Sequence, residues 1–189
     1  MSTQTALQQP AVMNGVNVTA LFETIKAVKT DAGLADFQFR ASNKWIDGGH
    51  NRSTIQSFHG CKAEDTTRTK PFVLDNDEPP VLLGKDAAAN PVEYILHALA
   101  GCLTTTMVYH AAARGIEIKA VESALEGDLD LRGFLGLSNE VRKGYHTIRV
   151  RMRVQSDAKP AMLRELAQFS PVYDMISRSV PVDVAVETY

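Results

Sequence analysis

A long stretch without charged residues constrains this chain more than any other feature of its sequence. From Tyr94 to Ala113 there is no Asp, Glu, Lys or Arg. Such a stretch could cross a bilayer or form a helix that is buried inside a protein. It contains His97, His110 and the run Thr104–Thr106, whose polar side chains disfavour hydrocarbon. We therefore expect a buried helix in a protein that has no membrane partner.

The residues that flank this stretch predict where the helix begins and ends. Asn90 is a good N-cap, Pro91 is tolerated at the first helical position, and Glu93 stands where a capping box needs a carboxylate. Gly115 can adopt the left-handed conformation that ends many helices. The sequence therefore predicts a central helix over 90–114. It is apolar nearly all round, so we expect it to be buried nearly all round.

Shorter patterns precede the central helix. Residues 1–17 are polar and aperiodic, which indicates a flexible tail. Apolar residues at helical spacing predict a helix over 18–30. Alternation over 37–41 then predicts a half-buried strand, the first of an N-terminal hairpin over 36–60.

The rest of the chain mixes strands and helices. A long charged connection carries a short predicted strand at 72–74. The elements predicted over 116–189 are strands at 116–130, 146–155 and 182–186, a helix at 159–169, and a second helix that Ser170-Pro171 begins. Strands and helices in blocks indicate an α+β fold. A length of 189 residues suits a single domain, which we place over 18–189.

Composition excludes several classes of function. The net charge is −2, so nothing indicates nucleic-acid binding. We expect the alternating Arg149, Arg151 and Arg153 either to pair across strands with acidic side chains or simply to face water. Those expected partners are Glu122, Glu126, Asp128 and Asp130. The first residues lack the pattern of a signal peptide and only two cysteines are present, so we expect a cytoplasmic protein with free thiols.

The two cysteines are Cys61 and Cys102. Within the central helix, a free cysteine such as Cys102 is most often a small buried hydrophobic residue. To act as a nucleophile it needs a cation or hydrogen-bond donors from another element, because the thiolate is the reactive form. Cys61, near the end of the predicted hairpin, is either an incidental loop thiol or a partner for Cys102. His59 and Cys61 alone do not make a metal site, so we expect no metal and no cofactor.

Three segments carry a resemblance to a known family. They are FRASNKWIDGGHNRSTIQSFHG, then NPVEYILHALAGCLTTTMVYHAAARGIEI, then VRKGYHTIRVRMRVQSDA together with FSPVYDMISRSVPVDV. They resemble, in that order, the N-terminal hairpin, the central helix and the C-terminal half of the OsmC/Ohr family of thiol-based redox proteins. The three blocks together cover about residues 36–189, and their shared order makes the resemblance specific.

The resemblance implies an OsmC-like fold, in which curved antiparallel sheets wrap around the long buried central helices of an intertwined homodimer. It also implies reduction of organic hydroperoxides by a peroxidatic thiolate, which becomes a sulfenic acid and is restored by thiols. Cys102 falls on the peroxidatic position of the helix motif. The resolving cysteine of the family precedes a proline where this chain has Ser170-Pro171. An external thiol or Cys61 would therefore have to resolve oxidised Cys102.

The hydroperoxide-reducing branch of the family holds its thiolate with an arginine of the N-terminal hairpin, which a glutamate near the start of the central helix orients. Arg52 is the best match for the arginine, and Arg40 is the alternative. Counting back from Cys102 places Val92 at the position of the glutamate, with Glu93 one residue later. One residue rotates a helix by about 100°, so Glu93 either orients the arginine or serves only the capping box.

We therefore expect a thiol-dependent peroxidase for organic hydroperoxides that acts in oxidative stress defence, as a homodimer with an external thiol reductant. Cys102, Arg52 and Glu93 are the expected catalytic residues, and Cys61 is the possible auxiliary thiol. The alternative is a dimer of the same fold that lost turnover and binds a small apolar ligand. Ser170 and Val92, which replace family residues, favour this alternative.

Overall fold

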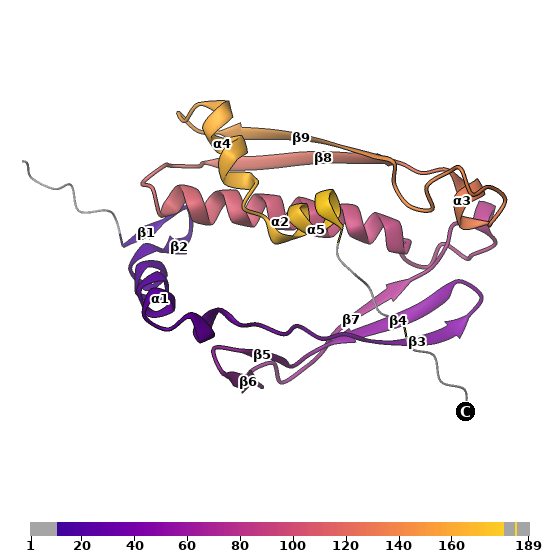
Figure 1. The fold of residues 1–189 in the computed structure, drawn as a ribbon, viewed down its shortest axis with the longest axis horizontal. Coiled ribbons are helices and arrows are strands. Elements are labelled where there is room, and N and C mark those ends of the chain that lie inside the picture. The colour runs from indigo at the N-terminus through magenta and orange to yellow at the C-terminus, as the bar shows by residue number, and fades with distance from the viewer. Residues whose placement is uncertain (1–10, 180–183, 185–189) are drawn as a thin grey trace, which may run out of the picture. The chain divides into compact units, whose positions relative to one another are not determined.

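The computed structural model describes residues 11–179 and 184, and its helices and strands confirm the predicted α+β class (Figure 1). Contacts divide the chain into two compact units, residues 17–95 and residues 96–189 with 1–16. The single domain over 18–189 stays a prediction. The predicted closing strand at 182–186 lies outside the described residues, except for Val184.

The unit of residues 17–95 begins with α1 (Val18–Thr30), which covers the range that the sequence predicts. The side chain of Asn17 caps this helix by accepting a hydrogen bond from the Ala20 N–H at 2.9 Å. Asp31 ends α1, and its carboxylate caps the short 3-10 helix η1 (Ala32–Ala35) that follows. The side chain of Asn17 thus fixes where α1 begins, and the side chain of Asp31 fixes where η1 takes over from it.

An antiparallel sheet of three strands, in the order β3–β4–β7, forms the largest part of this unit. Its strands are β3 (Ser42–Asp47), β4 (His50–Ile55) and β7 (Phe72–Asn76). A second antiparallel pair consists of β5 (Phe58–Gly60) and β6 (Ala63–Asp65). β3 and β4 thus confirm that a hairpin forms within the predicted range 36–60. β7 confirms the short strand that was predicted at 72–74.

The first strand of the hairpin begins later than the alternation of apolar residues predicts. Phe37 and Phe39 are 49% and 70% exposed, and their segment makes only an isolated bridge with His59. Their rings lie against Phe58 instead, with centroids 6.2 and 5.4 Å away. The half-buried strand predicted at 37–41 is wrong, because these aromatic side chains pack on one another rather than on a core.

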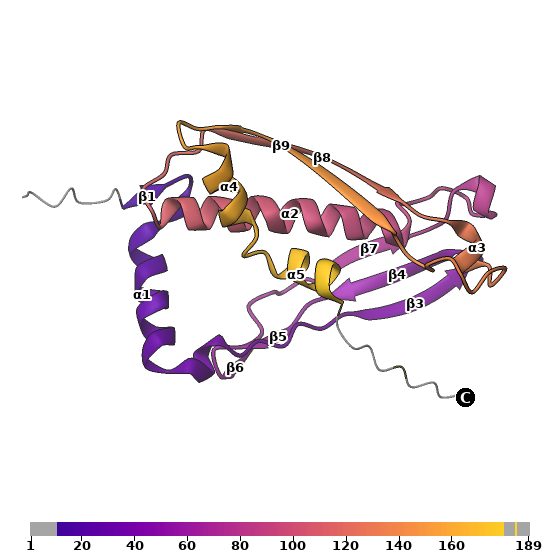
Figure 2. The ribbon, with the colours of Figure 1, turned by 45° about the horizontal axis from the view of Figure 1, so that its top comes forward.

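The second unit is built around α2 (Pro91–Ala112), the predicted central helix. An antiparallel pair of long strands, β8 (Ala120–Asp128) and β9 (Thr147–Gln155), runs alongside α2 (Figures 1 and 2). The shorter helices of this unit are α3 (Leu131–Phe134), α4 (Pro160–Ala167) and α5 (Pro171–Arg178). β8, β9 and α4 fall within their predicted ranges, and α5 begins at the predicted proline.

The core of this unit lies where one face of α2 meets α4. Leu99, Leu103, Met107 and Ala111 are spaced four residues apart along α2, and all of them are buried. They form a single stripe on the helix. The other members of the core are Leu163, Leu166 and Ala167 of α4, with Leu125, Ile148, Met152 and Val154 of the two long strands packed against them.

The opposite face of α2 is exposed, so the prediction that this helix is buried nearly all round is wrong for the single chain. Its exposed residues include Ala98, Gly101, Thr105 and Tyr109, which carry no charge. An uncharged helix face in contact with water is typical of a surface that another chain covers. Within the described residues, no helix has the length and hydropathy that a membrane span requires.

Residues 12–17 form a hairpin within the range where the sequence predicts a flexible tail, 1–17, of which residues 1–10 lie outside the described residues. Its strands are β1 (Val12–Met13) and β2 (Val16–Asn17). Asn14 and Gly15 join them with φ angles of 53° and 77°, the conformation that an Asn-Gly turn favours. The Asn14 side chain also donates to the Ile116 carbonyl and accepts from the Ile118 N–H, both at 2.9 Å. The tail prediction fails here because this turn and these long-range bonds order the segment.

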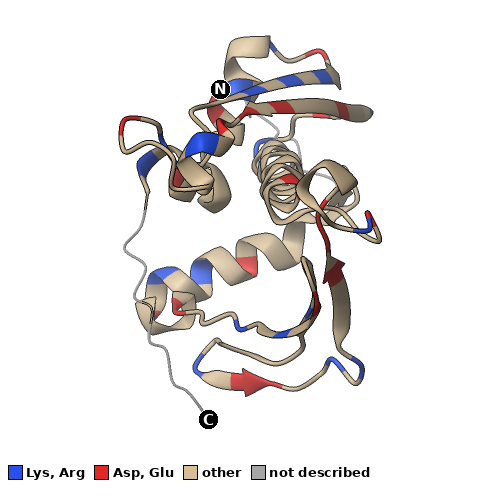
Figure 3. Cartoon of the chain, turned by 90° about the vertical axis from the view of Figure 1, so that its right-hand side faces the viewer, with Lys and Arg blue, Asp and Glu red and all other residues tan. Residues whose placement is uncertain are grey.

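Acidic residues of β8 lie beside basic residues of β9 (Figure 3). The pairs are Arg149 with Glu126 and Asp128, and Arg153 with Glu122. They confirm the predicted cross-strand pairing for Arg149 and Arg153, whereas Arg151 lies opposite Ala124 and is exposed. Asp130 departs from the prediction, because its carboxylate caps α3 and pairs with the neighbouring Arg132 at 2.6 Å.

Candidate active site

Cys102 lies in the middle of α2, one residue before Leu103 of the buried stripe. One residue turns the helix by about 100°, so the cysteine lies at the flank of the core face. Its side chain is half-buried and not sealed in the core. A thiol in this position is held by the protein and can still meet a small substrate.

Small side chains border Cys102 on the side away from the core. Ala98 and Thr105 are four residues before it and three residues after it, so they share its face of the helix. Gly101 is exposed, and a β-carbon added to it would meet no atom within 4 Å. The flank of α2 beside Cys102 is therefore open at Gly101.

Cys61 lies in a different setting, in the tight turn between β5 and β6. Cys61 and Lys62 have φ angles of 51° and 65°, the left-handed conformations of a two-residue hairpin turn. The Cys61 side chain is exposed. Both cysteines are free thiols, and they belong to different units of the chain. An auxiliary role for Cys61 stays a prediction.

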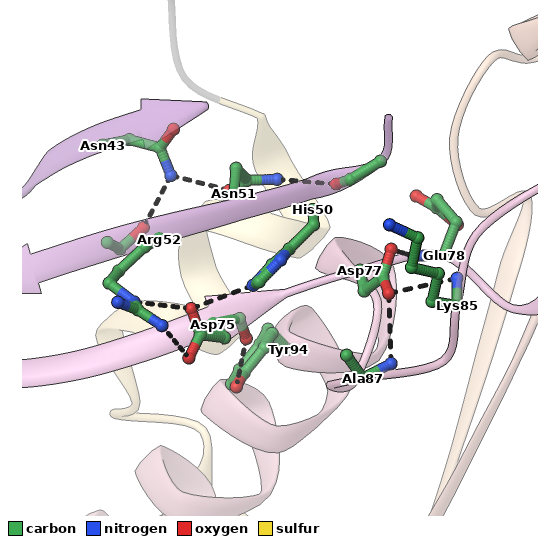
Figure 4. A network of polar contacts seen from close by, with 12 residues as sticks. Asn43, His50, Asn51, Arg52, Asp75, Asp77, Glu78, Lys85, Ala87 and Tyr94 are labelled. Carbon is green, nitrogen blue, oxygen red and sulfur yellow. Dashed lines mark hydrogen bonds and ion pairs between the residues drawn. The ribbon is translucent and has the colours of Figure 1, made fainter. Parts of the chain in front are cut away.

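Arg52 of β4 and Asp75 of β7 form a bidentate ion pair (Figure 4). The Arg52 Nε donates to Asp75 Oδ1 at 2.8 Å and the Nη2 donates to Oδ2 at 3.1 Å. His50 Nε2 lies 3.2 Å from the same Oδ1. The hydrogen bonds between Arg52 and Asp75 lower the pKa of Asp75 and raise that of Arg52. Both groups stay charged, and the guanidinium is held in one orientation.

Sequence reasoning missed Asp75. The residue is the direct partner of Arg52 in the register of β4 and β7, and opposite charges across strands would be its signal once that pairing is known. Its backbone carbonyl also accepts a hydrogen bond from the Tyr94 hydroxyl at 2.9 Å, which ties the first turn of α2 to β7 (Figure 4). The carboxylate that holds Arg52 thus comes from β7 and not from the central helix.

Glu93 instead fixes the start of α2. The Asn90 N–H donates to Glu93 Oε2, and the Glu93 N–H donates to Asn90 Oδ1, both at 2.9 Å. This reciprocal pair confirms the predicted capping box. Among the described residues, the hydrogen bonds of the Glu93 carboxylate go to this box and not to Arg52.

Arg40, the alternative arginine, is held in a similar way. Its Nη1 and Nη2 donate to the two carboxylate oxygens of Glu64 at 2.7 and 2.8 Å. These hydrogen bonds lower the pKa of Glu64 to about 2. The Arg40 and Arg52 side chains are 43% and 50% exposed, so the two arginines differ in partner rather than in burial.

The loop between β7 and α2 is organised by Asp77, which is 2% exposed. Its carboxylate accepts hydrogen bonds from the backbone N–H groups of Glu78, Lys85 and Ala87, at 2.8, 3.1 and 3.1 Å (Figure 4). These bonds, that from Ala87 most strongly, lower the pKa of Asp77. The buried carboxylate therefore closes this loop just before the helix begins.

Ser170 is the residue that stands where the resemblance to the OsmC/Ohr family implies a resolving cysteine. It is fully buried, and its hydroxyl accepts a hydrogen bond from the Tyr173 N–H at 3.1 Å. Ser170 is thus the N-cap of α5, as the sequence predicts. A hydroxyl in this place cannot form a disulfide with Cys102.

His110 is a packed residue of α2. Its ring stacks on Phe169 with centroids 4.5 Å apart, and burial, followed by the charge of Arg114, lowers its pKa. The Arg114 Nη1 also donates to the His110 backbone carbonyl at 3.0 Å. Within the part of the chain that the structure describes, no three metal-ligating residues gather into a cluster.

Comparisons with known proteins agree with the fold. A family model described as OsmC-like protein matches residues 84–185, more than half of the chain. An OsmC-like protein from Mycoplasma pneumoniae is 14% identical with a TM-score of 0.56, over 75% of this chain and 89% of that one. An OsmC-like protein of unknown function from Vibrio cholerae is 12% identical with a TM-score of 0.54, over 72% and 92%. No curated protein sequence matches this one. The chain belongs to the family of OsmC-like proteins.

Proposed function

We propose that the protein reduces organic hydroperoxides in oxidative stress defence, with Cys102 as its peroxidatic thiol. The observation that carries this proposal is the half-buried Cys102 in the middle of α2, within the segment that matches the family. A cysteine sealed in the core would not meet a substrate.

The proposed reaction transfers one oxygen atom to Cys102. The thiolate attacks the hydroperoxide, an S–O bond forms as the O–O bond breaks, and the leaving alkoxide takes a proton to become an alcohol. A thiol of an external dithiol then attacks the sulfenic sulfur, and water leaves as a mixed disulfide forms. The second thiol of that reductant releases Cys102. Ser170 stands where the resemblance places the resolving cysteine, so another thiol must resolve Cys102, and we assign this step to the external reductant.

Arg52 is the proposed cation that keeps Cys102 ionised, and Asp75 is its positioning residue. A guanidinium fixed by a bidentate carboxylate can stabilise a thiolate and direct the peroxide oxygens toward it. In this proposal Glu93 contributes through the capping box that fixes the start of the cysteine-bearing helix.

The proposal includes a homodimer in the cytoplasm, where thiol reductants are abundant. Its support is the exposed, uncharged face of α2, which includes Ala98, Gly101, Thr105 and Tyr109. Interfaces between subunits are depleted in charge at their centres and enriched in residues such as tyrosine. The residues named on this face carry no charge and include Tyr109.

Peroxide consumption tests the role of the cysteine. The wild type, mixed with cumene hydroperoxide and dithiothreitol, should consume the peroxide, and Cys102→Ser should not. Cys61→Ser is the matched control and should retain most of the rate. Equal rates for the wild type and Cys102→Ser would remove the proposal. No turnover by the wild type would instead favour the second candidate, a non-catalytic dimer, which Ser170 in the resolving position supports.

A pair of matched variants tests the role of the arginine. Arg52→Gln and Arg40→Gln each remove an exposed arginine from a bidentate ion pair in the same unit. We expect Arg52→Gln to lower the rate constant of Cys102 oxidation by about 100-fold, the size of effect that follows loss of one charge-stabilising donor. Arg40→Gln should stay near the wild-type rate. A slow Arg40→Gln beside a normal Arg52→Gln would assign the stabilisation of the thiolate to Arg40. If neither substitution changed the rate, the proposal that an arginine of this unit stabilises the thiolate would be removed.

A further inference from the structure

The unit of residues 96–189 contains a cavity of about 750 Å³ that the redox chemistry does not use. α2 contributes Leu103 and Met107 to its wall, whereas Cys102 does not line it. The rest of the wall comes from β9, from α4 with the residues just before it, and from α5. Sites for small molecules typically have volumes of roughly 300–1,000 Å³, so this cavity is large enough for a ligand.

The cavity exists because small side chains line part of it. Val150, Met152 and Val154 alternate along β9, so they present their side chains on one face. Ala158 and Ala167 belong to the same wall and fill little space. The lining is therefore largely aliphatic, which suits a chain of methylene groups.

Polar side chains that are exposed to solvent also line the cavity. Arg164 and Gln168 lie one turn apart at the end of α4, and Tyr173 lies on α5. With the described residues, the guanidinium, the amide and the phenol hydroxyl of these three side chains form no hydrogen bond or ion pair. Ser156 differs, because its hydroxyl already donates to the Glu117 carbonyl at 2.6 Å.

We propose that this cavity binds an aliphatic carboxylate, a medium-chain fatty acid in chemical class. The tail would lie against β9 and α2, and the carboxylate would bind Arg164. Arginine holds a carboxylate through two parallel hydrogen bonds, and Gln168 and Tyr173 can each donate a further one. The site is separate from Cys102, so it does not rest on the redox function.

The methionines of the chain allow a direct test. Met107 and Met152 line the cavity, whereas the exposed Met162 and Met175 do not. Protein labelled with ¹³C at the methionine methyl groups would be titrated with dodecanoate and, separately, with the uncharged dodecanol. We expect saturable shifts of the Met107 and Met152 signals, while the signals of Met162 and Met175 stay in place. The Cys102→Ser variant should bind dodecanoate with the same affinity.

Two variants test where the aliphatic tail and the carboxylate of the bound fatty acid lie in the cavity. Val150 is 37% exposed at the cavity wall, so Val150→Trp should block the site while the control methionine signals keep their positions. Arg164→Gln should lower the affinity for dodecanoate about tenfold and leave the affinity for dodecanol unchanged. Arg151→Gln is the matched control, because Arg151 is an exposed arginine on the opposite face of β9.

The proposal would be overturned by any of three results. The first is the absence of a saturable shift at Met107 and Met152 with dodecanoate. The second is an equal shift at all four methionines, which would show nonspecific binding. The third is an equal loss of dodecanoate affinity in Arg164→Gln and Arg151→Gln, or no loss in either.

Discussion

At the scale of single residues, carboxylates decide how the cations near the candidate site are held. Asp75 fixes Arg52, and Glu64 fixes Arg40, each through two hydrogen bonds. An arginine that is held in this way loses less side-chain freedom when it later binds an anion. The carboxylate partner is therefore as much a part of the proposed site as the guanidinium.

The ion pair of Asp75 should make stability depend on pH. The pKa of Asp75 is lowered in the folded protein, while an unfolded Asp has a pKa of about 3.9. The pair therefore contributes stability that is fully present above the unfolded pKa and is lost as the pH falls through the folded pKa. Urea unfolding should show Asp75→Asn less stable than the wild type at about pH 6, and the difference should shrink as the pH falls below the unfolded pKa of about 3.9.

Asp157→Asn is the control for this experiment. Asp157 is exposed, and with the described residues it makes no ion pair. Its substitution should shift the urea midpoint equally at pH values above and below the unfolded pKa of Asp75. A difference for Asp75→Asn that grew as the pH fell would contradict the assigned ion pair.

How far single residues could be predicted depends on the range of their contacts. The capping box of Asn90 and Glu93 and the N-cap at Ser170 involve neighbours in sequence, and both were predicted. Asp75 was not predicted, because its partner Arg52 is reached only through the pairing of β4 with β7. That pairing crosses a long connection whose path the sequence pattern does not give.

At the scale of elements, the hairpin β1–β2 is held to the segment after α2 by Asn14. Replacing Asn14 with Ala removes two hydrogen bonds and places at a φ of 53° a residue that tolerates the left-handed conformation less well than asparagine does. We expect a loss of about 3 kcal/mol in the free energy of unfolding, from about 1 kcal/mol for each bond and about 1 for the left-handed conformation. Urea denaturation measures it.

Asn14→Gly separates these two contributions. Glycine accepts the left-handed conformation but lacks the side-chain amide. It should therefore lose only the hydrogen-bond part, about 2 kcal/mol. Full wild-type stability of Asn14→Gly would show that the amide contributes nothing.

The cap of α5 gives a second prediction at this scale. Ser170→Ala removes the hydroxyl that accepts from the Tyr173 N–H in a buried place. We expect a loss of about 1.5 kcal/mol in the free energy of unfolding. Ser177→Ala removes an exposed hydroxyl of the same helix. It should change the free energy of unfolding by only a few tenths of a kcal/mol. Equal losses for the two variants would argue against Ser170 as a cap.

The elements that sequence patterns predicted best are those with long, uniform periodicity. α2 and β9 fall within their predicted ranges because alternation, capping and the C-terminal Gly115 all agree. The alternation at 37–41 predicted a half-buried strand that does not form, because the aromatic residues there pack on one another. Within 12–17 the tail prediction failed, because the Asn14-Gly15 turn is a stronger signal than the polar composition around it.

At the scale of the whole molecule, the exposed face of α2 leads to a prediction about assembly. Sedimentation should give twice the 20.7 kDa mass of one chain. Thr105→Arg places a charge on that face, and we expect the dimer dissociation constant to rise at least about tenfold. Thr24→Arg adds the same charge to an exposed threonine of α1 and should leave assembly unchanged. A monomeric wild type would contradict this prediction.

The account as a whole depends on whether Cys102 is a reactive thiol. Reduced protein would be treated with one equivalent of cumene hydroperoxide, without reductant and in the presence of dimedone, which traps sulfenic acids. Peptide mass spectrometry then locates the adduct. The account predicts that Cys102 carries it while the exposed Cys61 remains largely unlabelled. An adduct on Cys61 with none on Cys102 would contradict the account.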